Sequence, residues 1–176
     1  MKALFLDRDG VINVLRRNDY VKCPDEMVLL PGVAEAMMQL RSTFERIFIV
    51  TNQQGIGKGL MTEADLEAVH AKMTAAMPGC IDRIYYCPEL ESAHSFRRKP
   101  NIGMALQARR EYPEVRLKDS IMVGDSMTDM LFGRRAGMTT VLVGDNSDVW
   151  QTRPHLVDLR YPTLSAFANI IQQSKL

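Results

Sequence analysis

Cysteine is scarce in this chain, and long apolar runs are absent. The 176 residues include three cysteines, Cys23, Cys80 and Cys87, which are odd in number and far apart. This pattern argues against a disulfide framework and predicts reduced thiols and a cytoplasmic location. No run approaches the roughly 20 apolar residues of a membrane-spanning helix, and the start of the chain does not resemble a signal peptide. We therefore expect a cytoplasmic protein with no membrane partner.

A large excess of either charge is missing as well. Lysine and arginine total 22 and aspartate and glutamate 21, for a formal net charge of +1. Basic residues are not interleaved with aromatic ones, so nucleic acid is not an expected partner. No internal repeat, low-complexity tract or linker divides the chain, and 46% of its residues are hydrophobic. These features predict that residues 1–176 form a single globular domain.

Short apolar runs alternate with amphipathic ones along the whole chain. The runs predict strands at residues 3–6, 47–50, 81–87, 120–123 and 139–143, and helices near 31–40, 62–77, 102–112, 126–136 and 163–173. Thr62 and Asp65 have the spacing of a capping box, and Gly137 stands where a helix would end. Alternation of this kind predicts an α/β fold, a three-layer α/β/α sandwich around a mainly parallel, Rossmann-like sheet.

Polar side chains follow three of the predicted strands. Asp7 and Asp9 come after the first strand, Thr51 and Asn52 end the second, and Asp125 ends the fourth. The carboxyl ends of parallel strands form the ligand-binding edge of such sheets, so these residues should meet there. Neighbouring carboxylates repel unless a cation or a proton lies between them. Asp7 and Asp125 therefore predict a Mg²⁺ site of hard oxygen ligands.

Other polar residues allow more than one interpretation. The loop after Thr51 and Asn52 is rich in glycine and is either a phosphate cradle or a plain turn. Arg98 and Lys99 either bind an anion or belong to a solvated basic run. Asp129 either supports the metal site from behind or only places a negative charge near a helix N-terminus.

Four motifs, in order, resemble those of the haloacid-dehalogenase-like (HAD) phosphohydrolases. They are Asp7-Arg-Asp-Gly-Val-Ile, Val50-Thr-Asn, Lys99-Pro and Val123-Gly-Asp-Ser-Met-Thr-Asp. Within that superfamily the chain looks most like the D-glycero-D-manno-heptose-1,7-bisphosphate 7-phosphatase and histidinol-phosphatase family. The segments D-R-D-G-x-I-N, T-N-Q-x-G-I, Ile84-Tyr-Tyr-Cys-Pro, Arg98-Lys-Pro and Gly103-Met carry this finer match.

The resemblance implies a role for each matching residue. Asp7 would be the nucleophile that forms an aspartyl-phosphate, and Asp9 the general acid and base that also offers its backbone carbonyl to Mg²⁺. Asp125 would complete the metal site. Phosphate or substrate binding would fall to Thr51, Asn52, Gln53, Arg98, Lys99 and Ser126, and to Asp19 and Tyr20 in an early loop with two extra residues before it.

The chain departs from these relatives in one loop. They carry zinc ligands as C-x-H and C-x-C before R-K-P, whereas this chain has Cys87, Glu89, Ser95 and Arg97 at those positions. Only the first ligand is present, so we expect no zinc. The segments where HAD enzymes insert a separate cap domain are also short here, and the resemblance therefore implies a capless enzyme.

Together these features predict a Mg²⁺-dependent phosphatase whose partner is a small phosphorylated substrate. A sugar phosphate such as D-glycero-D-manno-heptose 1,7-bisphosphate is the leading expectation. Histidinol phosphate and a nucleic-acid 3′-phosphate are the alternatives. The protein is expected to be a monomer or a weak homo-oligomer.

Overall fold

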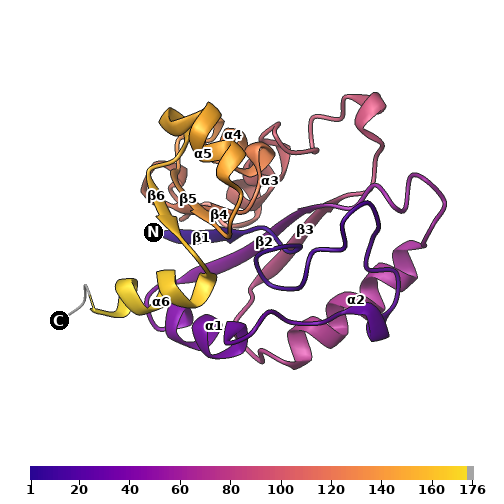
Figure 1. Ribbon diagram of the computed structural model, residues 1–176, viewed down its shortest axis with the longest axis horizontal. Coiled ribbons are helices and arrows are strands. Elements are labelled where there is room, and N and C mark those ends of the chain that lie inside the picture. The colour runs from indigo at the N-terminus through magenta and orange to yellow at the C-terminus, as the bar shows by residue number, and fades with distance from the viewer. Residues whose placement is uncertain (174–176) are drawn as a thin grey trace.

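The computed structural model describes residues 1–173, and within them the strands form one parallel sheet in the order β3-β2-β1-β4-β5-β6 (Figure 1). The strands are β1 (Ala3–Leu6), β2 (Arg46–Asn52), β3 (Arg83–Cys87), β4 (Ile121–Gly124), β5 (Thr139–Val143) and β6 (Leu159–Tyr161). The order reverses direction between β1 and β4, which is the position where ligands bind in doubly wound sheets.

Helices cover both faces of the sheet (Figure 1). They are α1 (Val33–Arg41), α2 (Glu63–Ala75), α3 (Gly103–Glu111), α4 (Met127–Arg135), α5 (Ser147–Thr152) and α6 (Leu164–Gln173). Successive strand residues point to opposite faces, and the core follows that alternation. In β1, Leu4 and Leu6 pack with residues of α1, α2 and α6, whereas Phe5 packs with residues of α3 and α4. The predicted three-layer α/β/α sandwich is confirmed.

All five predicted strands and all five predicted helices are present, with small shifts at their ends. Thr62 and Asp65 form the predicted capping box of α2, and Gly137, with a φ of +75°, follows the end of α4. One strand, β6, and one short α-helix, α5, were not predicted. β6 is a three-residue strand at the sheet edge with two exposed residues, so it has no apolar run to detect.

No helix in residues 1–173 combines the length and apolar character that a transmembrane span requires.

Candidate active site

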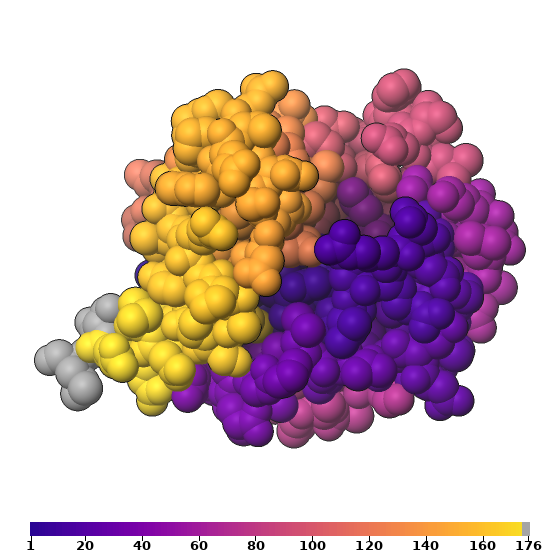
Figure 2. Space-filling view, viewed as in Figure 1, coloured from indigo at the N-terminus to yellow at the C-terminus, as the bar shows by residue number. Residues whose placement is uncertain are grey.

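A cavity of about 290 Å³ opens at the carboxyl ends of β1, β2 and β4. The structure places most of the predicted site residues around it: Asp7, Asp9, Asp19, Tyr20, Thr51, Asn52, Lys99, Asp125 and Ser126. Asp129, which the sequence left with two interpretations, lies there too. The space-filling view shows a hollow between the indigo N-terminal part of the chain and the orange segment that contains α4 and α5 (Figure 2).

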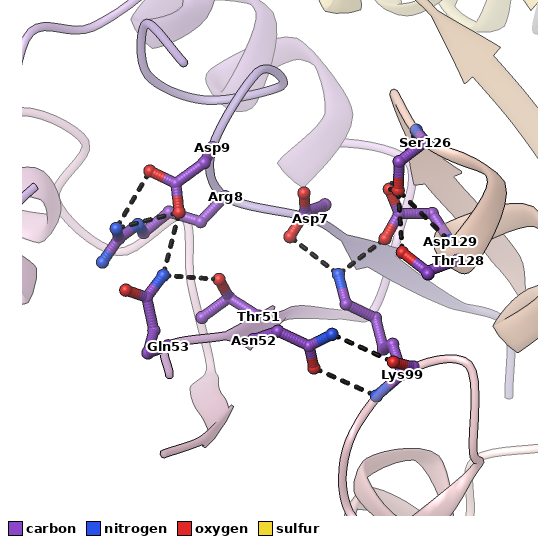
Figure 3. A network of polar contacts seen from close by, with 10 residues as sticks. All are labelled: Asp7, Arg8, Asp9, Thr51, Asn52, Gln53, Lys99, Ser126, Thr128 and Asp129. Carbon is purple, nitrogen blue, oxygen red and sulfur yellow. Dashed lines mark hydrogen bonds and ion pairs between the residues drawn. The ribbon is translucent and has the colours of Figure 1, made fainter. Parts of the chain in front are cut away.

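The ammonium group of Lys99 lies at the centre of this site (Figure 3). Its Nζ is 2.7 Å from Asp7 Oδ1 and 2.6 Å from Asp129 Oδ1, and its side chain is only 3% exposed. Burial alone would lower the pKa of Lys99, but the charges of Asp129 and Asp7 outweigh it and raise that pKa. Lys99 is therefore a fixed positive charge held between two carboxylates.

Asp125 adds a third carboxylate beside Asp7 and Asp129. Oxygen atoms of Asp7, Asp125 and Asp129 lie within 4.8 Å of one another. Burial, and then the charge of Asp129, raise the pKa of Asp7 well above its usual value, although Lys99 opposes them. Burial and Asp129 also raise the pKa of Asp125 to about 7. One lysine does not offset three carboxylates, so the cluster gains stability from an added cation or proton.

The donor set of this cluster fits Mg²⁺. All three side chains offer hard oxygen ligands, and the open cavity leaves room for water and a phosphate group. The backbone beside the cluster leaves no room for a side chain at residue 10, because a Cβ atom on Gly10 would overlap the Asp125 carboxylate. Gly10 also has a φ of +87°, which glycine adopts readily.

The raised pKa of Asp125 predicts how metal-free protein responds to pH. In the unfolded chain this carboxyl has a pKa of about 3.9, so the folded protein holds the Asp125 proton more tightly than the unfolded chain does. The stability that this gives the folded protein is complete below about pH 3.9 and is lost as pH rises through about 7. We expect the free energy of unfolding in EDTA to be roughly 2–3 kcal/mol lower at about pH 8 than at about pH 5. Urea titrations would measure this. Mg²⁺ should restore stability at the higher pH, and Asp125→Asn should reduce the difference, the remainder coming from the raised pKa of Asp7. Equal stability at both pH values in EDTA would contradict the raised pKa.

Hydrogen bonds at the start of α4 hold Asp129 in place. Ser126 is the N-cap of that helix, and its side chain accepts a hydrogen bond from the Asp129 N–H while Asp129 Oδ2 accepts one from the Ser126 N–H. The other carboxylate oxygen, Oδ1, binds Lys99. Asp129 is therefore both a capping residue and part of the charged cluster. The Ser-x-x-Asp spacing was the signal that could have placed it at the site.

The side chain of Asp9 points away from Asp7 (Figure 3). Its carboxylate accepts two hydrogen bonds of 2.9 Å from the fully buried Arg8, one of 3.0 Å from Asn13 and one of 2.8 Å from Gln53. Burial alone would raise the pKa of Asp9, but the charge of Arg8 and these hydrogen bonds lower it. In this conformation Asp9 is a proton acceptor rather than a donor.

The three residues after Val50 have different environments. Thr51 is buried at the cavity, and its Oγ1 accepts a hydrogen bond from Gln53 Nε2. Asn52 bonds to both the N–H and the carbonyl of Lys99, each at 3.0 Å, and so holds the backbone of that residue. Gln53 does not line the cavity, and its Nε2 donates a hydrogen bond to the Asp9 carboxylate. The amides of Asn52 and Gln53 thus position other site residues, an arrangement the sequence did not predict.

Arg98 does not line the cavity either. Its Nη1 is 3.5 Å from the carbonyl oxygen of Glu89, in the loop after β3 where the family resemblance implied zinc ligands. In that loop the Cys87 thiol donates a 2.8 Å hydrogen bond to Glu89 Oε2. Arg97 donates to the carbonyl of Tyr86 instead of facing the cavity.

These contacts favour a loop without zinc. Burial, with the hydrogen bond to Glu89, raises the pKa of the Cys87 thiol to about 11, so without metal this thiol is protonated and donates to the carboxylate. We expect protein purified without added metal to contain less than about 0.1 zinc per chain by elemental analysis, because one thiol leaves the tetrahedral set incomplete. One tightly held zinc per chain that resists mild chelation would contradict this prediction.

Comparisons with known proteins agree with the geometry. The model of the HAD-hydrolase-like family matches residues 96–158. The chain is 42% identical over 131 residues to D-glycero-alpha-D-manno-heptose-1,7-bisphosphate 7-phosphatase of Mycobacterium tuberculosis (strain H37Rv), covering 73% of this chain and 69% of that protein. It is 40% identical over 152 residues to the D-glycero-beta-D-manno-heptose-1,7-bisphosphate 7-phosphatase of Escherichia coli K12, covering 80% and 78%.

A solved structure resembles the whole chain. The D,D-heptose 1,7-bisphosphate phosphatase of B. bronchiseptica, crystallised with magnesium and phosphate, has a TM-score of 0.89 and 32% sequence identity, covering 99% of each chain.

Proposed function

Because the chain belongs to the family of HAD-like hydrolases that includes the D-glycero-D-manno-heptose-1,7-bisphosphate 7-phosphatases, we propose that it removes the 7-phosphate from such a heptose bisphosphate. The observation that carries this proposal is Lys99 held between Asp7 and Asp129 at the floor of an open cavity. A fixed cation beside a carboxylate is suited to holding a phosphoryl group for attack.

We propose Mg²⁺ as the cofactor, held by the Asp7 and Asp125 side chains and by the backbone carbonyl of Asp9. When bound, it would supply positive charge that attracts the phosphate group and offsets the negative charge of the transferring phosphoryl oxygens. The clustered carboxylates, and the raised pKa values of Asp7 and Asp125 among them, support this assignment.

The chemistry then follows from the side chains. A carboxylate oxygen of Asp7 attacks phosphorus and forms an aspartyl-phosphate, while the bond from phosphorus to the sugar oxygen breaks. Asp9 gives a proton to that oxygen, so the sugar leaves as an alcohol. Asp9 next takes a proton from water, whose oxygen attacks phosphorus, and the Asp7 carboxylate and inorganic phosphate are released. Lys99 and Thr51 hold the phosphoryl oxygens through both steps.

Asp9 must change its contacts during this cycle. As described, its carboxylate accepts hydrogen bonds from Arg8, Asn13 and Gln53, and its pKa is lowered. To donate a proton it has to turn from these donors toward the cavity, which it already lines.

The change Asp9→Asn should therefore reduce kcat by a factor of about 10²–10⁴ and leave Mg²⁺ binding largely unchanged, because only the side chain is altered. Steady-state assays and calorimetric titration with Mg²⁺ measure the two effects. Asp148→Asn, at an exposed position of α5, is the matched control. If kcat stayed within threefold of the unmodified protein, Asp9 would not be the acid.

A panel of phosphate esters tests the proposed function. We would assay the purified protein with Mg²⁺ on both anomers of the heptose bisphosphate, histidinol phosphate, a DNA oligonucleotide with a 3′-phosphate and p-nitrophenyl phosphate. The expected result is the highest kcat/KM on one heptose anomer. A higher kcat/KM on histidinol phosphate or on DNA would replace this proposal with that alternative.

We also propose that the protein acts in the cytoplasm. Its three cysteines are free, and Cys80 and Cys87 are buried, as expected where thiols stay reduced. Fractionation of the source cells with an antibody against the protein would test this location.

A further inference from the structure

We propose that His70 is a positioning residue for the reaction, because it holds the Arg8 guanidinium and, through it, the side chain of Asp9. This inference rests on the proposed function, in which Asp9 transfers protons. It adds a residue of α2 that does not line the catalytic cavity. It starts from the contacts of Asp9 on the side away from Asp7 (Figure 3).

Arg8 links His70 to Asp9. It is fully buried, its Nη2 donates both 2.9 Å hydrogen bonds to the Asp9 carboxylate, and its Nη1 lies 3.2 Å from Nε2 of His70. A guanidinium has only donors, so Nε2 of His70 is the acceptor and the ring proton is on Nδ1. Burial, and then the charge of Arg8, lower the pKa of His70 to about 4, in keeping with a neutral ring. His70 is therefore an uncharged acceptor for the group that binds Asp9.

The imidazole is itself held firmly. Val69 and Met73, on the same helix, are buried and pack in one core cluster with residues of β1, the strand that ends just before Asp7. The ring of Tyr86, from β3, packs edge-on against the imidazole, with ring centres 6.3 Å apart. His70 is thus fixed relative to the strand that carries the catalytic carboxylates.

The other partners of Asp9 allow it to turn while Arg8 stays in place. Asn13 Nδ2 and Gln53 Nε2 donate to the same carboxylate as Arg8. Among the residues that the structure describes, the amide oxygens Asn13 Oδ1 and Gln53 Oε1 are buried and have no hydrogen-bond partner. Rotation of either amide would present its oxygen to Arg8 after Asp9 has left. His70 is the acceptor that serves Arg8 in both conformations without moving.

Loss of this acceptor should hinder proton transfer by Asp9. Without the imidazole, Nη1 has no partner there, and the guanidinium is free to turn so that Nη1 and Nη2 both bond to Asp9. A bidentate pair of this kind holds a carboxylate more strongly than bonds from one nitrogen. Asp9 would then turn toward the cavity less readily, and the proton would reach the sugar oxygen less often.

The leaving group separates this role from a structural one. The sugar oxygen needs a proton as its bond to phosphorus breaks, whereas p-nitrophenolate leaves without one. Because kcat/KM reports the steps up to release of the leaving group, His70→Phe should lower it about tenfold on the heptose ester and less than about twofold on p-nitrophenyl phosphate. His70→Gln, whose amide oxygen reaches the position of Nε2, should keep both values within about threefold. His70→Asn is too short to reach Arg8 and should behave like His70→Phe.

Two further measurements test the link to Asp9. In an Asp9→Asn protein, His70→Phe should cause less than about twofold further loss on the heptose ester, because the residue through which it acts is already changed. NMR of protein labelled at its histidine nitrogens should show His70 protonated on Nδ1 and not on Nε2, a result that does not depend on turnover. His155→Phe, at an exposed position, is the matched control and should leave both kcat/KM values unchanged.

Several results would overturn this inference. It is wrong if His70→Phe lowers kcat/KM equally on both esters or on neither, if the loss persists in the Asp9→Asn protein, or if Nε2 carries the ring proton. If thermal melting shows that His70→Phe does not fold, equal activity of His70→Gln and His70→Asn would overturn it instead. Failure of the unmodified protein to hydrolyse either heptose ester would contradict the proposed function. The comparison would then use the alkyl ester of the panel that the protein hydrolyses best, and would still report on His70.

Discussion

Replacing Asp7 with asparagine should abolish phosphatase turnover, with kcat reduced by a factor of about 10⁴ or more. An amide oxygen is a poor nucleophile and a weaker ligand for Mg²⁺ than a carboxylate. The fold should persist, because asparagine has the same shape and the Asp7 N–H keeps its 2.9 Å bond to the carbonyl of Val123. Metal-free protein should be no less stable than before, since a buried carboxylate that Asp129 and Asp125 repel has been removed.

Phosphate release measured on the preferred ester of the panel would test this prediction. Circular dichroism and thermal melting would show that the variant is folded, and Asp145→Asn at an exposed position is a suitable control. Turnover by Asp7→Asn within tenfold of the unmodified protein would rule out a covalent mechanism through this residue.

The change Lys99→Ala should harm both catalysis and stability. It removes the cation that holds a phosphoryl oxygen, which we expect to cost about 10²–10³ in kcat/KM on every substrate of the panel. It also leaves Asp7 and Asp129 buried without their shared partner, and removing one member of a buried ion pair destabilises a protein by about 3–5 kcal/mol. Lys99→Arg should not restore activity, because a guanidinium group is larger and planar and the site is shaped around one ammonium.

Urea unfolding in EDTA and kinetics across the panel would measure the two effects. Lys118→Ala, which removes an exposed lysine just before the amino end of β4, should change neither the stability nor the kinetics. A change in the ranking of substrates at unchanged overall rates would show that Lys99 selects the substrate instead of holding the reacting phosphoryl group.

The sequence predicted the fold because its signals were local and strong. Apolar runs such as Ala3–Leu6 and Thr139–Val143 are strands at the predicted positions, and the carboxyl ends of strands brought Asp7, Thr51 and Asp125 to one edge. Those positions follow from the alternation of elements alone, without knowledge of any side-chain conformation.

What the sequence could not give were the directions of polar side chains. Nothing in the D-x-D motif indicates that Asp9 turns toward Arg8, because that choice depends on a buried guanidinium and on donors from distant residues. His70 is another side chain whose contacts the sequence does not indicate. Its Nε2 lies 3.2 Å from Arg8 Nη1, and burial lowers its pKa to about 4, so a neutral imidazole supports the arginine from α2. Contacts between residues 62 positions apart have no local signal.

The bond between Lys99 and Asp7 also says something about the order in which this protein acquires its function. It joins residues 92 positions apart, and within that span Asn52 meets the backbone of Lys99 across 47 positions. Such contacts close long loops, which is entropically costly and slow. Until β1, β2 and β4 have docked, the carboxylates remain in water, separate from their lysine. Catalytic competence therefore requires these three strands to be in place together, and a chain without that arrangement would release no phosphate.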